Sequence, residues 1–234
     1  MNLSAGNPFS TRHVQPGALE FLFPPGENAD RLVERLRTFG WWGQLLGPHG
    51  AGKTTLLHTL RPRLEKAGRQ IEWYTLRGGQ RRLPKTPRPT RTASPRNNLI
   101  IVDGYEQLDR WARWQLKRRC RRAGSGLLVT SHADAGFPLI HQVQPSLPIV
   151  LRLVSQLLAP DASGPRVSRS ELAAESPTNA RTRGASPLSS QKHFADSGIK
   201  RQEVADCFRA WKGNVREVLF ELYDLHETRC REGR

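Results

Sequence analysis

The segment GPHGAGKT at residues 47–54 constrains the fold of this 234-residue chain more than any other feature. It follows the spacing G-x-x-x-x-G-K-[ST], in which glycines let backbone N–H groups turn inward around phosphate oxygens. Lys53 supplies a charge for the β- and γ-phosphates, and the Thr54 hydroxyl is a suitable ligand for Mg²⁺. An apolar run precedes the segment, and a helical pattern with leucines on one stripe follows it. The pattern predicts a phosphate-binding loop between a buried strand and a helix.

This spacing is the Walker A motif, and it predicts ATP with Mg²⁺ as the cofactors of the chain. His49 occupies a variable position of the loop, where a spacer role is the simplest interpretation. The residues predicted to bind the nucleotide are the loop and the threonine after it: Gly47, Pro48, His49, Gly50, Ala51, Gly52, Lys53, Thr54 and Thr55.

A second apolar run, LIIVD at residues 99–103, resembles a Walker B strand. In a parallel sheet its terminal acid emerges beside the phosphate loop, so Thr54 and Asp103 are the predicted metal residues. Many ATPases of this type place a glutamate directly after this aspartate, but here Gly104 follows. Glu106 is the nearest substitute and a candidate catalytic residue. The alternative is an ordinary acid in the first turn of a helix, where the dipole favours it.

Two further candidates lie downstream of the Asp103 strand. Thr130 ends the next expected strand, where a hydroxyl can reach the γ-phosphate or its water; a simple turn is the alternative. In the tail, the segment GNVRE at 213–217 suits a helix start, with Asn214 as the N-cap. Arg216 does not fit that explanation, because a cation in the first turn opposes the dipole. A nearby anion would offset this unfavourable interaction. The alternative is that Arg216 is an ordinary exposed side chain.

Strand and helix patterns alternate through the middle of the chain, which predicts a parallel sheet covered by helices. The expected fold is an α/β, three-layer sandwich of the P-loop NTPase type, with a small C-terminal helical lid. Strands are expected near 41–47, 71–76, 99–103, 126–130 and 138–145. The expected domains are an N-terminal linker and helix (1–40), the core (41–159), a disordered linker rich in Ser, Pro, Ala and Arg (160–190) and a helical, lid-like tail (191–234).

On the basis of these motifs, the chain resembles a compact AAA+ ATPase over residues 43–158 and 191–229. Thr130 lies where that family has its sensor 1, and GNVRE is similar to its sensor 2 segment. The resemblance implies a Mg-dependent ATPase with Glu106, Thr130 and Arg216 as catalytic residues. It also implies a homo-oligomer, since such proteins commonly take an arginine finger from a neighbour.

Other P-loop classes fit less well. The segment LRGGQ at 76–80 is similar to the ABC transporter motif LSGGQ, and His132 falls where those proteins have a switch histidine. However, prolines at 84, 87 and 89 follow where a helix should open. A GTPase is disfavoured because the sequence has no DxxG after the Asp103 strand and no NKxD. Two alternatives stay open: a non-hydrolysing ATP-dependent switch or adaptor, motivated by Gly104, and a small-molecule kinase with the loop 77–96 as its lid.

The chain is strongly basic, with 37 Lys+Arg against 21 Asp+Glu and a formal net charge of +16. Residues 77–122 hold fourteen of the basic residues and three acidic ones. Trp111 and Trp114 flank a basic stripe there, so this surface is predicted to contact nucleic acid. A solvated, arginine-rich face is the alternative. The stripe consists of Arg110, Arg113, Lys117 and Arg121.

Composition also disfavours several classes of protein. No run approaches the roughly 18 apolar residues of a membrane span, and no apolar h-region is visible near the start of the sequence. Three widely spaced cysteines predict reduced thiols and a cytoplasmic location rather than a disulfide framework.

Overall fold

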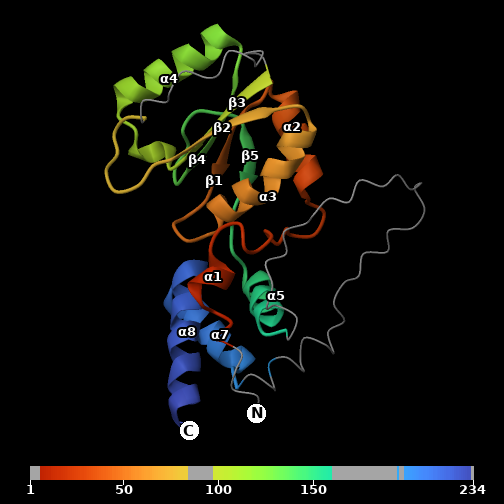
Figure 1. Ribbon diagram of the computed structural model, residues 1–234, viewed down its shortest axis with the longest axis vertical. Coiled ribbons are helices and arrows are strands. Elements are labelled where there is room, and N and C mark those ends of the chain that lie inside the picture. Colours follow the sequence, from red (N-terminus) through yellow and green to blue (C-terminus); the bar gives the residue numbers. More distant parts are fainter. Residues whose placement is uncertain (1–5, 84–96, 160–193, 195–197, 233–234) are drawn as a thin grey trace, which may run out of the picture. The chain divides into compact units, whose positions relative to one another are not determined.

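The computed structural model describes residues 6–83, 97–159, 194 and 198–232. Its residues group into two compact units (Figure 1). One unit, residues 20–144, contains the sheet; the other combines residues 1–19 with residues 145–234. The linker predicted at 160–190 lies outside the described residues.

The sheet unit contains five parallel strands in the order β2-β3-β4-β1-β5. The strand before the phosphate loop, β1, therefore lies between β4 and β5, and β3 pairs with β4 on its other side. This parallel sheet confirms the predicted α/β fold class. The strands are β1 (Trp42–Leu46), β2 (Gln70–Thr75), β3 (Asn98–Asp103), β4 (Gly126–Ser131) and β5 (Leu139–Gln142).

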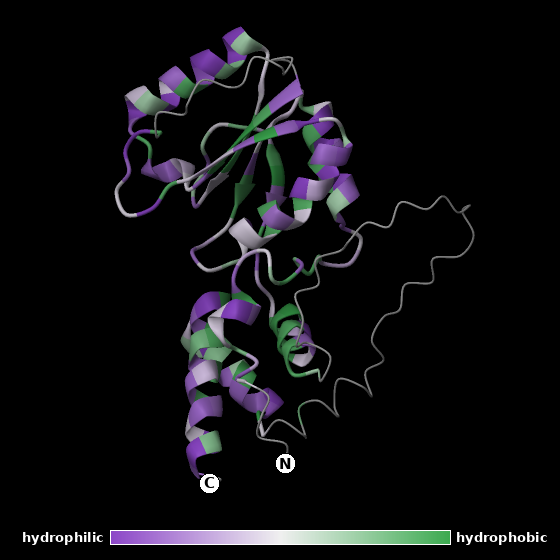
Figure 2. Ribbon diagram, viewed as in Figure 1, coloured by the Kyte–Doolittle hydropathy of each residue, from purple (hydrophilic) through white to green (hydrophobic). Residues whose placement is uncertain are grey.

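Helices cover both faces of this sheet, which explains why its central strands are continuously apolar. Along β3, alternate side chains enter opposite cores: Leu99 packs on one face and Ile100 on the other. Figure 2 shows the hydrophobic colouring of the central strands. The first core is closed by α2 (Ala29–Thr38) and α3 (Lys53–Lys66), the second by the short 3-10 helix η2 (Tyr105–Gln107) and by α4 (Arg110–Ala123).

The helical unit has its own apolar core. Val154 of α5, Val204 of α7 and Leu222 of α8 are fully buried in it, together with Phe9 from the N-terminal segment. The packing thus groups α5 with the C-terminal helices and α2 with the sheet. The domain boundaries predicted from the sequence, after residues 40 and 159, remain a prediction. The helices of this unit are α1 (Thr11–Val14), α5 (Leu147–Leu157), α7 (Arg201–Ala210) and α8 (Val215–Glu232). Across the described ranges, no helix combines the length and apolar character that a membrane span needs.

Cysteine reactivity tests the packing of α4. Cys120 has no exposed surface, and burial raises the pKa of its thiol to about 12. We therefore expect iodoacetamide at about pH 8 to leave Cys120 unmodified in the folded protein, since the thiolate is the reactive form. Cys230 is half-buried and should react. Peptide mass spectrometry distinguishes the sites, and urea should expose all three thiols. Equal labelling of Cys120 and Cys230 in the folded protein would contradict this packing.

Candidate nucleotide-binding site

The loop at residues 47–52 connects β1 to the N-terminus of α3. Gly52 is the N-cap of α3 and has a φ of 100°, a conformation that side chains with a Cβ rarely adopt. At Gly47, an added Cβ would lie 2.6 Å from the Val143 carbonyl oxygen. The glycines therefore allow the turn that leads into a 14-residue helix, whose first N–H groups are free of intrahelical partners.

The Lys53 side chain is buried at this turn. Its ammonium donates to the carbonyl oxygens of Gly47 (2.6 Å) and Pro48 (2.8 Å) and lies 3.1 Å from His132 Nδ1. These contacts hold the ammonium within the loop, where a cation suits a site for an anion such as phosphate.

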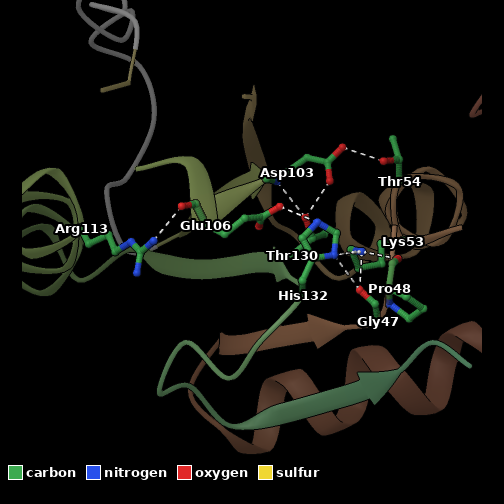
Figure 3. Close-up of polar contacts among 10 residues, drawn as sticks. Gly47, Pro48, Lys53, Thr54, Asp103, Glu106, Arg113, Thr130 and His132 are labelled. Atoms are coloured by element: carbon green, nitrogen blue, oxygen red, sulfur yellow. Dashed lines mark hydrogen bonds and ion pairs between the residues drawn. The ribbon is translucent and has the colours of Figure 1, made fainter. Parts of the chain in front are cut away.

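Asp103 ends β3 and accepts two hydroxyl hydrogen bonds (Figure 3). Thr54 donates to its Oδ2 at 2.8 Å, and Thr130 donates to its Oδ1 at 2.7 Å. The fully buried Thr130 oxygen also accepts from the Gly104 N–H at 2.9 Å. Thr130 thereby orients the Asp103 carboxylate, and its predicted contact with the γ-phosphate or water stays a prediction.

The chemistry of these donors fits Mg²⁺. Thr54 and Asp103 present hard oxygen atoms side by side, and Mg²⁺ is commonly held by one or two carboxylates together with phosphate oxygens and water. Within the described residues, no cluster of three or more His, Cys, Asp or Glu side chains forms an all-protein metal cage. Thr54 and Asp103 are thus the residues that could hold Mg²⁺, together with phosphate oxygens and water.

Glu106 lies at the same edge of the sheet, in η2. Its Oε1 is 2.8 Å from His132 Nε2, while its Oε2 is buried and has no hydrogen-bond partner among the described residues. Arg113 of α4 donates to the Glu106 carbonyl oxygen at 2.8 Å and so fixes this turn (Figure 3). The carboxylate consequently has one oxygen held by His132 and one enclosed oxygen that lacks a donor among the described residues.

The structure also explains why glycine follows Asp103. Gly104 has a φ of 89°, and an added Cβ would lie 2.8 Å from the Leu76 carbonyl oxygen. A glutamate at this position would have to adopt an unfavourable positive φ, and its Cβ would clash with the backbone just after β2. Glu106 instead brings a carboxylate to the end of the sheet from two residues further along.

His132 was noted from the sequence only in the ABC comparison and was not among the predicted site residues. Its ring lies between Lys53 and Glu106, with Nδ1 also 3.0 Å from the Gly47 carbonyl oxygen. With the proton on Nε2, His132 donates to Glu106 and accepts from Lys53 through Nδ1. Its position just beyond β4, the strand that lies between β1 and β3, could have indicated a role at the site. Sequence analysis instead favoured Thr130, which lies in the same short run of polar residues.

The loop after His132 is held by Gln44 of β1, which is buried in the sheet. The Gln44 amide donates to Asp134 Oδ1 and to the Phe137 carbonyl oxygen, both at 2.7 Å, and its Oε1 accepts from the Ala135 N–H at 2.9 Å. All of its amide groups are thus used on one loop. This anchoring fixes the backbone that carries His132.

The sequence-predicted residues of the sheet unit come together at one edge. His49 adds a ring contact with His132, with centroids 3.4 Å apart, and Thr55 follows in the first turn of α3. Arg216 is exposed near the start of α8 in the helical unit, so its role as a sensor stays a prediction. The residues joined by direct contacts are Gly47, Pro48, Lys53, Thr54, Asp103, Glu106, Thr130 and His132.

Fold and site together define a P-loop α/β protein with a candidate nucleotide-binding edge. No protein-family model and no curated protein matches the sequence. Among the solved structures that are similar, two share 13% sequence identity with this chain. One is a DNA replication initiation factor (TM-score 0.49, covering 94% of this chain), and the other is C. elegans PCH-2 (TM-score 0.35, covering 86%). The chain spans 66% of the length of each.

The role of Thr130 as the support of Asp103 can be tested by Thr130→Val, which keeps the shape and removes the hydroxyl. This change leaves the Gly104 N–H and one Asp103 oxygen without their buried partner. We therefore expect the free energy of unfolding to fall by about 1–3 kcal/mol. Thr130→Ser retains the hydroxyl, so its free energy of unfolding should fall by less. Urea denaturation measures both variants. Equal stability of the valine variant and the wild type would contradict the assignment.

Proposed function

We propose that this chain is an AAA+-like ATPase that binds ATP with Mg²⁺ at residues 47–55 and hydrolyses it. The observation that carries the proposal is the run of contacts from Lys53 through His132 to Glu106, beside the Thr54–Asp103 pair. A phosphate-binding cation, a pair of metal-binding oxygens and a carboxylate with an available oxygen thus lie at one edge of the sheet. Phosphoryl transfer to water needs these three kinds of group.

The loop residues have the binding role. Backbone N–H groups at the start of α3 and the Lys53 ammonium would hold the phosphates through charge-assisted hydrogen bonds. Thr54 and Asp103 would hold Mg²⁺, which neutralises charge on the phosphate oxygens. Thr130 keeps the Asp103 carboxylate turned toward this position.

Glu106 has the role of accepting a hydrogen bond from the attacking water. Its buried Oε2 is the available acceptor, and His132 holds Oε1 so that the carboxylate keeps one orientation. A positioned carboxylate of this kind acts as a base or aligns the nucleophile. Arg216, the lid-like tail and a homo-oligomer belong to the same proposal through the AAA+ resemblance alone.

A second candidate, a non-hydrolysing switch, is favoured by the position of His132. When phosphate takes the Lys53 ammonium, His132 loses one partner while still bonded to Glu106 and attached to the loop that Gln44 anchors. Nucleotide binding would then change this loop without any hydrolysis. Turnover measurements distinguish the two candidates.

Lys53→Ala tests the binding site. Removing a charge-assisted hydrogen bond costs about 1.5–3 kcal/mol, so we expect ATP affinity to fall roughly 10- to 150-fold. The matched control is Lys66→Ala, at the exposed far end of α3, which should bind ATP as the wild type does. Titration calorimetry measures both. If ATP binding survives Lys53→Ala unchanged, the assignment of the loop is wrong.

Glu106→Gln and His132→Ala test the catalytic assignment. General-base catalysis contributes about 10²–10⁴-fold, so phosphate release by Glu106→Gln should fall by that range while ATP binding is retained. His132→Ala should lower turnover by a smaller factor, because the carboxylate remains but is less well oriented. Glu65→Gln, an exposed acid on α3, is the control. Wild-type turnover that survives Glu106→Gln would exclude this role, and tight binding without any wild-type turnover would favour the switch.

A further inference from the structure

The outward side of α4 combines two exposed indoles with cations. Trp111 and Trp114 are 55% and 53% exposed, and they lie one turn apart on a single side of the helix. The opposite side, with Leu116 and Cys120, is buried in the second core of the sheet unit. We call the outward side the Trp–Arg face; its residues, all exposed, are Trp111, Trp114, Gln115, Arg118 and Arg122.

Arginines surround both indoles. The Arg118 guanidinium lies 5.0 Å from the Trp114 ring centre, and that of Arg82 lies 5.7 Å from the Trp111 ring centre. The segment carrying Arg82 is fixed beside the helix, because the Arg81 carbonyl oxygen accepts from the Asp109 N–H at 3.1 Å. Each ring is thus accompanied by a cation that can contact a phosphate when the ring stacks on a base.

The charge of this face is not neutralised along the helix. Residues 110–122 contain seven basic side chains and no acidic one. Arg119 is paired with Glu72 at 3.2 Å and lies beside the face rather than on it. The helix dipole explains cations in the last turn of α4, but it does not explain Arg82 or Arg118 beside exposed tryptophans.

The sequence-based stripe of Arg110, Arg113, Lys117 and Arg121 is divided by the structure. Arg113 donates to the carbonyl oxygens of Glu106 and Leu108, and Lys117 lies over the Phe137 ring at 4.3 Å. Burial lowers the pKa of Lys117, in keeping with this inward position. These two cations support the loops of the candidate nucleotide site. The contact surface for a partner is therefore the Trp–Arg face.

We propose that the Trp–Arg face, with Arg82, binds single-stranded nucleic acid through base stacking on Trp111 and Trp114. The positive charge of residues 110–122, which include no acidic side chain, is complementary to a phosphate backbone. Exposed indoles can stack on bases only where those bases are not already stacked in a duplex. An anionic membrane fits less well, because Gln115, Arg118 and Arg122 occupy the positions where a membrane-surface helix would carry apolar side chains.

This inference gives a partner to the proposed ATPase, but binding itself does not depend on nucleotide hydrolysis. The test uses the full chain and a fluorescein-labelled oligothymidylate of about 20 nucleotides, longer than the roughly 4–16 nucleotides that one small domain contacts. Fluorescence anisotropy is measured in parallel with a duplex of equal length and with vesicles containing phosphatidylserine. We expect the single strand to bind best, with affinity that falls as salt rises.

Two variants identify the surface. The double variant Trp111→Ala/Trp114→Ala should weaken binding at least about tenfold, since each stacked base contributes roughly 5- to 150-fold. The corresponding phenylalanine substitutions should restore most of it. Arg118→Glu should weaken binding and lower the salt dependence by about 0.7 per lost phosphate contact.

Matched controls remove the same kind of side chain elsewhere. Trp211→Ala deletes an indole that is 43% exposed in the helical unit, and Arg37→Glu reverses an exposed charge on α2. Both should bind as the wild type does. The proposal is overturned if the oligothymidylate does not bind, if duplex or vesicles bind better, or if the Trp111/Trp114 variant matches Trp211→Ala. If the protein binds the oligothymidylate but does not hydrolyse ATP, the ATPase proposal is wrong and the nucleic-acid proposal is still supported.

Discussion

The two hydrogen bonds that Asp103 accepts hold the candidate site together. They come from Thr54 at the start of α3 and from Thr130 at the end of β4, so a single carboxylate joins the phosphate loop, β3 and β4. This is possible because the parallel strands end at one edge, where the buried apolar sheet first gives way to polar groups. The positions of Glu106 and His132 follow, since Gly104 bonds to the same Thr130 hydroxyl and turns the chain toward η2.

Helix α4 connects this edge to the protein surface. Its inward side packs on the sheet and its flank contributes Arg113, which holds the Glu106 carbonyl. Its outward side exposes Trp111 and Trp114. The helix thus supports the Glu106 turn from its flank and exposes the Trp–Arg face on its outward side. A basic helix that looks uniform in sequence therefore has two different sides in the fold.

Sequence alone predicted the sheet and most of the residues that the structure brings together at the candidate site, because the phosphate loop and the Asp103 strand depend on local patterns of glycine and apolar residues. It could not predict His132, whose partners Lys53 and Glu106 lie 79 and 26 residues away and meet only through strand order. For the same reason it treated Arg113 and Lys117 as surface charges: helical spacing shows which residues share a side, not which loops pack against it. The place of α5 likewise depends on tertiary packing against α7 and α8, which no local pattern contains.

We propose that the Lys53 ammonium, Thr54 and Asp103 form a site for the terminal phosphates of ATP together with Mg²⁺. Calorimetric titration of the full chain with ATP, in Mg²⁺ and then in EDTA, tests it most directly when AMP is titrated in parallel. We expect saturable binding of one ATP per chain, weaker binding in EDTA and little binding of AMP, which lacks the β- and γ-phosphates. Equal affinity for ATP and AMP, or ATP affinity that is indifferent to Mg²⁺, would contradict it.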